Sequence, residues 1–405
     1  MIITLKIFPE YYNTQRKNYI LKVLFIFGTR PEAIKLVPLI KKFSNYKSSS
    51  VCLCVTGQHR QMLDQVLGIF NIKTHYDLNL MTKNQTLANI TGECIKKLTN
   101  IIYEEQPNLV IVQGDTTSAF CGAISSFYNK TPVGHVEAGL RTNNMYSPWP
   151  EEGNRRLISV LSLLHFAPTK TAKDNLIAEG INSNNIYITG NTVIDALEMA
   201  MKNIIFDNKT KTELSNWFSK ICSSSEDIID KRKKLILITG HRRENFGCKM
   251  EKIFTSIRNL AIRYPQITFL FPVHLNPIVN DIVKPILSNL DNVILIKPVQ
   301  YIQMVYIMMK AHLIITDSGG IQEEAPSLQT PVLVTRDESE RPEGIKAGCS
   351  KLVGYDRNKI ESTFIDLIEN KSSYNNMLIN NNPYGDGNSA LKILDIIINH
   401  FKVKK

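Results

Sequence analysis

Three carboxylates in the first half of the chain have the residue types and spacing expected for proton transfer. Asp115 lies in a Gly-Asp-Thr turn, Glu137 falls within PVGHVEAGLRT, and Glu151 follows YSPWP at a predicted helix start. Clustered carboxylates push their pKa values apart, which leaves one proton donor and one acceptor near neutral pH. For a single carboxylate, a structural role as a helix cap or surface residue would be as good an interpretation as a catalytic one. Three at one edge of a sheet favour general acid–base chemistry.

Histidine and arginine side chains follow predicted strands in the second half. The motif TGHRRENFG carries His241 and Arg242, PVHLNP carries His274, and SERPEG carries Arg341. A lone histidine is usually structural, but His241 directly follows an apolar run and precedes two arginines, which favours anion stabilisation or proton transfer. Arg341 is suited to close over a phosphate, because a guanidinium binds phosphate through two parallel N–H groups.

The motif TDSGGIQEEA (316–325) has the composition of a diphosphate-binding turn. It follows an apolar run and opens a predicted helix, so Ser318, Gly319 and Gly320 let the backbone approach an anion at unpaired N–H groups. Glu324, expected about two turns into that helix, is suited to accept hydrogen bonds from two ribose hydroxyls. The structural alternative is a tight turn followed by solvated glutamates, and the position after a strand favours binding.

The motif FGTRPEAIK ends the first predicted strand and carries Arg30 and Lys35, which can reach a phosphate or a uracil from the opposite domain. The chain has neither a Gly-x-Gly-x-x-Gly fingerprint nor a Gly-Lys-Ser/Thr P-loop. No His/Cys cluster has the spacing of zinc ligands. The sequence therefore argues against a dinucleotide redox cofactor, ATP cleavage and a metal site.

Short apolar runs alternate with segments of helical period, which is typical of parallel sheets covered by helices. One series runs from 21–28 to 185–190, a polar stretch at 202–233 breaks the rhythm, and a second series runs from 234–240 to 350–354. We predict an α/β fold with two doubly wound, Rossmann-like domains facing each other across a cleft. The expected ranges are an extension (1–20), a first domain with the acid–base carboxylates (21–200), a second, nucleotide-binding domain (201–385) and a helix that crosses back to the first domain (386–405).

Ligands of such sheets bind beyond the carboxyl ends of the strands. Nearly all the candidate residues above follow a predicted strand, and this shared position is a stronger signal than any single motif. The close spacing of His135, Glu137 and Arg141 fits the same rule. We expect these charges to lie where an apolar strand emerges into the cleft.

Composition narrows the function classes further. The 405 residues are 43% hydrophobic with a net charge of +11, but the lysines are scattered, which favours a solvated surface over nucleic-acid binding. No apolar run is long enough to span a bilayer, and the first residues lack a signal-peptide pattern. Seven cysteines, none in a C-x-x-C motif, predict reduced thiols in a cytoplasmic protein.

Ten motifs together resemble the bacterial non-hydrolysing UDP-N-acetylglucosamine 2-epimerases, in order from about residue 21 to the C-terminus. They are GTRPEAIKLVPLI, TGQHRQMLDQVL, QGDTTSA, HVEAGLRT, YSPWPEEGNRR, TGNTVIDAL, TGHRREN, TDSGGIQEEAPSL, RPEG and NPYGDGNSA. The resemblance implies a glycosyltransferase-B-like homodimer that interconverts UDP-GlcNAc and UDP-ManNAc without NAD or a required metal, for use in cell-envelope polysaccharide. It implies anti elimination of UDP to 2-acetamidoglucal, followed by re-addition.

The resemblance also implies residue roles. By matching motifs, the acid–base groups would be Asp115, Glu137 and Glu151, assisted by His241. The contacts to UDP would be Arg30, Lys35, His274, Ser318, Gly319, Gly320, Glu324 and Arg341. A second, activating UDP-GlcNAc would meet Gln58, Gln61, Arg242 and His274. One departure is Asn84, which stands where a basic residue is expected and bears on the strength of that activation.

Other functions compete with this interpretation. A UDP-sugar glycosyltransferase of the same fold would share the DSGG turn but would not need three carboxylates plus HRREN. A hydrolysing 2-epimerase would diverge at GTRPEA. A nucleotide-sugar-binding regulator would not need the carboxylates. An epimerase acting on a modified UDP-N-acetylhexosamine is a further alternative.

Overall fold

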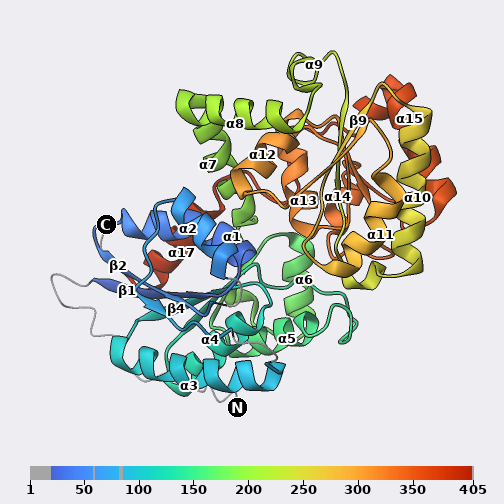
Figure 1. The fold of residues 1–405 in the computed structure, drawn as a ribbon. Helices are drawn as coiled ribbons and strands as arrows, with labels where there is room; N and C mark the ends of the chain where they lie inside the picture. Colours follow the sequence, from blue (N-terminus) through green and yellow to red (C-terminus); the bar gives the residue numbers. More distant parts are fainter. Residues whose placement is uncertain (1–19, 58–59, 82–84, 404–405) are drawn as a thin grey trace.

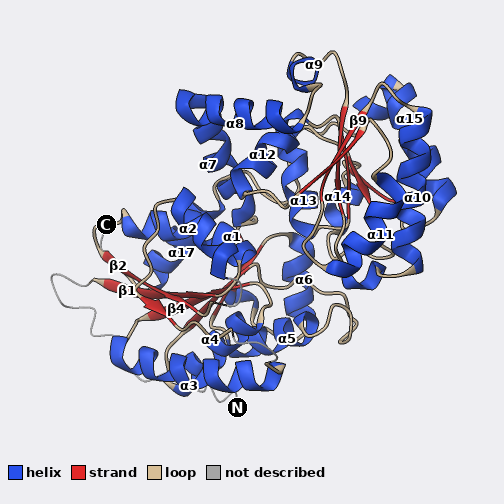
Figure 2. Cartoon of the chain, in the orientation of Figure 1, coloured by secondary structure: helices blue, strands red, loops and turns tan. Residues whose placement is uncertain are grey.

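The computed structural model of the chain describes residues 20–57, 60–81 and 85–403, and it contains two parallel β-sheets, each covered by helices (Figures 1 and 2). This arrangement of two α/β domains confirms the predicted fold class. Within the described ranges, no helix is both long enough and apolar enough to cross a membrane. Residues 1–19 of the expected extension lie outside the described residues.

The first sheet has the order β3-β2-β1-β4-β5-β6-β7, with parallel pairing throughout. Its strands are β1 (Leu21–Phe27), β2 (Ser49–Val55), β3 (Tyr76–Asp77), β4 (Leu109–Gln113), β5 (Val133–Val136), β6 (Leu164–Ala167) and β7 (Ile186–Ile188). Its helices are α1 (Arg30–Ser44), α2 (Arg60–Ile69), α3 (Leu87–Glu105), α4 (Thr117–Tyr128), α5 (Glu151–Leu161), α6 (Lys170–Ala178) and α7 (Thr192–Phe206), with a 3₁₀ turn at Ser183–Asn185.

Alternation along β1 explains the two helical layers of this domain. Side chains of successive strand residues point to opposite faces, so a strand buried on both faces is apolar throughout. Leu24 and Ile26 pack with α3, α4 and α5, whereas Phe25 and Phe27 belong to the core that contains α1 and α7. Figure 1 shows α3, α4 and α5 on one side of the sheet and α1, α2 and α17 on the other.

The second sheet has the order β10-β9-β8-β11-β12-β13, again parallel. Its strands are β8 (Leu235–Thr239), β9 (Thr268–Pro272), β10 (Val293–Ile296), β11 (Leu313–Thr316), β12 (Val332–Val334) and β13 (Ser350–Leu352). The helices of this half are α8 (Asn208–Ile221), α9 (Ser225–Ile229), α10 (Cys248–Arg263), α11 (Pro277–Leu287), α12 (Tyr301–Lys310), α13 (Gly319–Glu324), α14 (Pro342–Lys346), α15 (Arg357–Glu369), α16 (Lys371–Asn375) and α17 (Ser389–His400), with 3₁₀ turns at Arg243–Asn245 and Ala325–Leu328.

One continuous apolar core joins the two domains. It contains residues of α1 and α7 together with residues of β8, α12 and α17. Helix α17 packs on α1 and α7, and Asp195 of α7 accepts hydrogen bonds from the backbone of Ser389 and Ala390 at the start of α17. Helix α7 (Thr192–Phe206) continues through residues 200 and 201, where we expected the first domain to end and the second to begin. The domain boundary between these two residues stays a prediction.

Candidate active site

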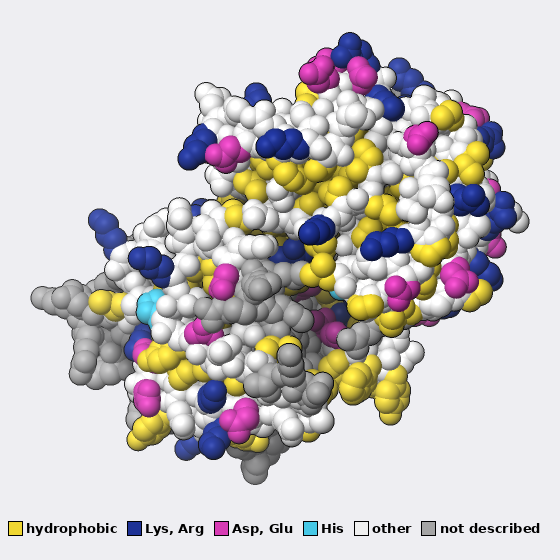
Figure 3. All heavy atoms as spheres, viewed as in Figure 1, with side chains coloured by type: hydrophobic (Ala, Val, Ile, Leu, Met, Phe, Trp, Pro, Cys, Tyr) yellow, Lys and Arg dark blue, Asp and Glu magenta, His cyan; other side chains and the backbone are white. Residues whose placement is uncertain are grey.

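The candidate residues of both domains lie in the segments that follow the strands, and several of them meet across the domain junction. Charged side chains of both signs are visible along the line where the domains meet (Figure 3). After β1, Thr29 caps α1 and Glu32 accepts hydrogen bonds from the Gly28 and Thr29 backbone and from the Thr116 hydroxyl at 2.6 Å. Glu32 therefore links the first strand end to the turn that carries Asp115.

Two cations and two carboxylates form an ion cluster across the junction. Lys35 of α1 donates to Glu137 and lies 3.5 Å from Glu323 of α13. Arg341 donates to Glu323 at 2.7 Å and lies 3.7 Å from Glu137. Each cation therefore faces both carboxylates, and each carboxylate faces both cations. We call Lys35, Glu137, Glu323 and Arg341 the charge square.

Glu137 follows β5 in a left-handed backbone conformation, with φ of 64°. The Gln113 amide donates to its carboxylate at 2.7 Å. Burial is the largest influence on its pKa and raises it, while Lys35 and Arg341 act in the opposite direction. Glu137 is thus a buried carboxylate whose protonation depends on its ionic partners.

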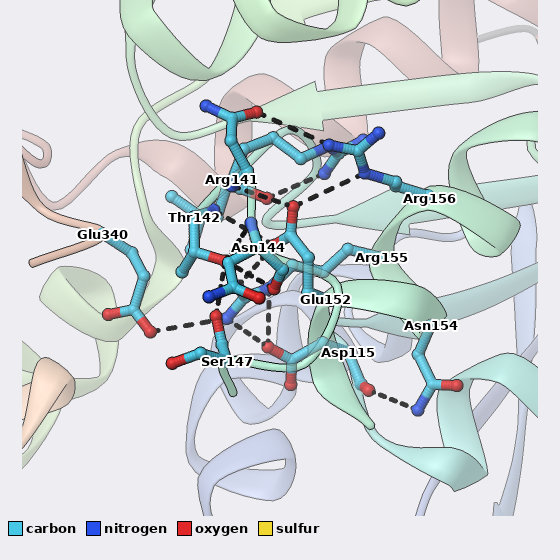
Figure 4. A network of polar contacts seen from close by, with 12 residues as sticks. Asp115, Arg141, Thr142, Asn144, Ser147, Glu152, Asn154, Arg155, Arg156 and Glu340 are labelled. Atoms are coloured by element: carbon cyan, nitrogen blue, oxygen red, sulfur yellow. Dashed lines mark hydrogen bonds and ion pairs between the residues drawn. The ribbon is translucent and has the colours of Figure 1, made fainter. Parts of the chain in front are cut away.

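Asp115 is held by an arginine from α5. Arg155 approaches the same Asp115 oxygen with Nε at 2.9 Å and with a terminal nitrogen at 2.7 Å. The Arg155 guanidinium also binds Glu152 at 3.1 Å and lies 3.9 Å from Glu340 of the second domain (Figure 4). The Asn154 amide adds a hydrogen bond to the Asp115 carbonyl at 2.9 Å. These contacts fix the Asp115 carboxylate beside a permanent positive charge.

Glu151, the first residue of α5, contrasts with Asp115. Its Oε2 atom is buried without a hydrogen-bond partner. Burial is the main reason that the pKa of Glu151 is raised, and the Asp115 charge acts in the same direction. Two neighbouring carboxylates, one paired with a guanidinium and one half-buried with a buried Oε2 atom, are a suitable proton acceptor and donor.

The turn after β11 leads into the short helix α13 and is covered by Arg341. Helix α13 has six residues, and Glu324 is its last residue, so it lies about one and a half turns from the helix start. A side chain at Gly319 would meet the Arg341 guanidinium carbon at 2.4 Å, whereas nothing lies within 4 Å of a β-carbon built at Gly320. Arg341 therefore rests directly on the glycine backbone of the turn that Ser318 begins.

Glu324 is buried against α12, where it accepts a hydrogen bond from the Tyr301 hydroxyl at 2.7 Å. Burial raises the pKa of Glu324 to about 7, against the effect of that hydrogen bond. Arg30 donates to the Val299 carbonyl at 3.3 Å and so also reaches this part of the second domain. Two predicted UDP contacts, Arg30 and Glu324, are thus close enough to interact electrostatically.

His241 and His274 stack with ring centroids 5.1 Å apart. The loop that carries His241 is fixed by Asp317, whose carboxylate accepts from the His241 and Arg242 backbone at 2.9 Å and 2.8 Å. Burial lowers the pKa of His241, and Asp317 opposes this shift. The Nε atom of Arg242 is buried without a hydrogen-bond partner.

The expectation for the stretch around residue 135 was wrong for two of its three charged residues. His135 is fully buried within β5, where its Nε2 bonds the Gly114 carbonyl at 2.7 Å. Burial lowers its pKa to about 3, so this histidine is neutral. Arg141 pairs with Glu179 at 2.7 Å and donates to Ser159, so it braces α5 and α6. Glu137 is the member of this group that joins the charge square.

The activator residues are only partly described. Gln58 and Asn84 lie outside the described residues, and the side chain of Gln61 is not described although its backbone belongs to α2. Among the side chains that the structure does describe, no group of three His, Cys, Asp or Glu residues could hold a metal ion. All seven cysteines are free thiols.

Four further charged residues are important for the site although sequence reasoning did not select them: Arg155, Asp317, Glu323 and Glu340. Glu340 connects the charge square to the ion pairs around Asp115. It accepts hydrogen bonds from Arg336 at 2.6 Å and from Arg341 at 3.1 Å, and it lies 3.9 Å from Arg155. Its pKa lies well below the usual value because these arginines outweigh its burial. Asp317, Glu323 and Glu340 stand directly beside selected residues in TDSGGIQEEA and SERPEG, and this adjacency was the available signal.

The fold and the site together define a two-domain α/β protein of the glycosyltransferase-B-like type. The family model described as UDP-N-acetylglucosamine 2-epimerase matches residues 41–398. A Neisseria meningitidis UDP-N-acetylglucosamine 2-epimerase is 48% identical over 93% of this chain and 99% of its own length, and an Escherichia coli K12 relative of the same name is 46% identical over 94% and 99%. The chain therefore belongs to the UDP-N-acetylglucosamine 2-epimerase family.

A solved structure agrees with this assignment. The crystal structure of the Neisseria meningitidis UDP-GlcNAc 2-epimerase bound to UDP-GlcNAc has a TM-score of 0.89 against this chain, and the match covers 94% of this chain and all of that one. A putative UDP-N-acetylglucosamine 2-epimerase from Listeria monocytogenes, 43% identical, has a TM-score of 0.87 over 95% and 97%. The family resemblance and the fold predicted from the sequence are confirmed.

Proposed function

We propose that this protein catalyses the reversible C2 epimerisation of UDP-N-acetylglucosamine to UDP-N-acetylmannosamine, without hydrolysing the sugar nucleotide. The observation that carries the mechanism is the pair Asp115 and Glu151. Arg155 holds the first carboxylate beside a positive charge, and burial favours the protonated form of the second. One site thus offers both a proton acceptor and a proton donor.

In the proposed mechanism, Asp115 takes the C2 proton while the C1–O bond breaks. The C2–H electrons form the C1=C2 double bond of 2-acetamidoglucal, and UDP leaves with the C1–O pair. Glu151 then delivers a proton to the opposite face of C2, and the UDP oxygen rebonds to C1. The roles of the two carboxylates exchange in the reverse direction.

The second domain, together with Lys35 and Arg341 of the charge square, would hold UDP during these steps. Glu137 is the third proposed acid–base group, and turnover would depend on its protonation state as well as on those of Asp115 and Glu151. We assign the diphosphate to the turn of Ser318, Gly319 and Gly320, with Lys35 and Arg341 as its cations, because departing negative charge needs fixed positive charge. The remaining contacts are Glu324 at the ribose, with Arg30, His241 and His274 beside it. We also propose a cytoplasmic homodimer with an activating UDP-GlcNAc at Gln58, Gln61, Arg242 and His274, and a product used in cell-envelope polysaccharide.

Proton NMR of the purified protein with UDP-GlcNAc in D₂O tests the reaction. We expect UDP-ManNAc to appear with deuterium at C2, because the acidic hydrogen that Glu151 delivers comes from solvent and is a deuteron in D₂O. Release of UDP and free ManNAc would mean a hydrolysing enzyme. Failure to form any product, with the protein folded and excess UDP-GlcNAc present, would contradict the proposal and favour a transferase or another UDP-sugar.

A further inference from the structure

The charge square has a feature that its two predicted UDP contacts and its predicted acid–base group do not explain. Its fourth member, Glu323, is 1% exposed, and its Oε2 atom has no hydrogen-bond partner although Lys35 lies 3.5 Å away. A buried carboxylate is costly unless it is paired, and the hydrogen bond from Arg341 at 2.7 Å reaches only the Oε1 atom of Glu323. Its presence between two cations therefore calls for a function in the square.

Two of the four contacts in the charge square lie within one domain, and the other two cross the domain junction. Lys35 pairs with Glu137 inside the first domain, and Arg341 pairs with Glu323 inside the second. The contacts from Lys35 to Glu323 and from Arg341 to Glu137 cross the junction at 3.5 Å and 3.7 Å. Separation of the domains would break only the crossing contacts and leave each domain with a complete ion pair. The square is thus a means of joining the domains without burying an unpaired charge.

We infer that Glu323 is a positioning residue that acts on Glu137 through Lys35 and Arg341. By sharing both cations, it sets how much positive charge Glu137 receives when the domains are closed. Glu323 thereby keeps Glu137 able to exchange a proton rather than fixed as a permanent anion. This inference rests on the proposed epimerase function and assigns a part in it to a residue that touches no reacting atom.

Four elements or segments around Glu137 each contribute one polar or charged group that faces it. They are Lys35 of α1, Gln113 of β4, Glu323 of α13 and Arg341 before α14. The two cations lower the pKa of Glu137, whereas burial and the Glu323 charge raise it. Loss of the Glu323 charge removes one of the two influences that raise the pKa of Glu137, so we expect this pKa to fall.

The test is the pH dependence of kcat at saturating UDP-GlcNAc for the wild type and three variants. Glu323→Gln keeps the side-chain shape but removes the charge. In this variant we expect the limb of the pH profile that reports the ionisation of Glu137 to move to lower pH by about one unit. Glu323→Asp keeps the charge and should keep the wild-type limb even if kcat falls. Glu343→Gln is the control, because Glu343 accepts from Thr169 across the same junction at 2.6 Å but lies outside the square. Its profile should not move.

Each outcome separates this inference from the proposed function. A wild-type protein that forms no UDP-ManNAc would overturn the epimerase proposal itself. An active wild type with an unshifted Glu323→Gln profile would overturn the role of Glu323 alone. If thermal unfolding shows that Glu323→Gln does not fold, Arg341→Gln provides the opposite test, since loss of a cation should move the same limb to higher pH. No shift, or a downward shift, in that variant would also overturn the role of Glu323.

Discussion

The imidazole rings of His241 and His274 lie nearly parallel, 12° apart in plane and 5.1 Å between centroids, at the ends of neighbouring strands β8 and β9. Asp317 lies 3.6 Å from the His241 Nδ1. The stack and the Asp317 carboxylate together define the surroundings in which His241 would assist UDP departure.

We predict that His241 titrates below the ordinary histidine pKa and that Asp317→Asn lowers its pKa further. Burial is the main cause of the lowered pKa, and the Asp317 carboxylate is the influence that raises it. NMR titration of the histidine ring protons measures both values, with His241→Gln used to assign the resonance. A rise in the His241 pKa after removal of the Asp317 charge would contradict this account.

Arg155→Lys should lower kcat by about 100-fold while the affinity for UDP stays within about twofold. Lysine retains the charge but cannot hold Asp115 with two nitrogens as Arg155 does, and small misplacement of a catalytic group costs this much rate. Arg156→Lys is a matched control on the same helix, since Arg156 faces Glu152 and Glu179. Equal losses of kcat in the two variants would argue against a specific role of Arg155 in positioning Asp115.

Asp115→Asn should reduce turnover by about 100-fold to 10,000-fold, the usual contribution of a positioned proton acceptor. UDP should still bind, because the proposed diphosphate turn belongs to the other domain. Turnover is measured by NMR and UDP binding by calorimetry. Asp337→Asn serves as control, because Asp337 pairs with Lys249 on the surface. Undiminished turnover in Asp115→Asn would exclude its catalytic role.

UDP-GlcNAc should bind more tightly as the pH rises, by about tenfold between about pH 6 and about pH 8. Burial raises the pKa of Glu324 to about 7, and only the ionised carboxylate can accept hydrogen bonds from both ribose hydroxyls. Calorimetry with the Asp115→Asn protein measures this without turnover, and the sugar nucleotide itself does not titrate in this range. Adding Glu324→Gln should weaken binding and abolish its pH dependence. A dependence that persists would place the ribose elsewhere.

The strands and the strand-end residues were predictable because they depend on local patterns. A continuous apolar run followed by a polar turn and a helical period specifies a parallel strand, and this places Lys35, Asp115 and Glu137 at one edge of the sheet. Capping was equally local, as shown by Thr29 and Glu32 at the start of α1.

The partners across the domain junction were not predictable, since they depend on how the two domains are placed. Lys35 and Glu323 are far apart in sequence, and no pattern within either segment indicates their pairing. Arg141 shows the same limitation, because it lies in the loop after β5 and its partner Glu179 follows the end of α6. The polar stretch at 202–233 contains α8 and α9, and α8 buries only Leu214 and Phe218, which lie about one helical turn apart.

The attachment of the last helix provides a test of stability rather than activity. Asp195 accepts hydrogen bonds from the backbone of Ser389 and Ala390 at 3.2 Å and 2.8 Å, so it satisfies donors at the start of α17 that the helix cannot satisfy itself. Asp195→Ala should lower the free energy of unfolding by about 1–3 kcal/mol, because both buried N–H groups lose their acceptor. Asp174→Ala, which removes an exposed ion pair with Lys170 on α6, should cost about 0.5 kcal/mol or less. Urea denaturation measures both values, and an Asp195→Ala protein as stable as the Asp174→Ala protein would show that the apolar face of α17 alone holds the helix on α1 and α7.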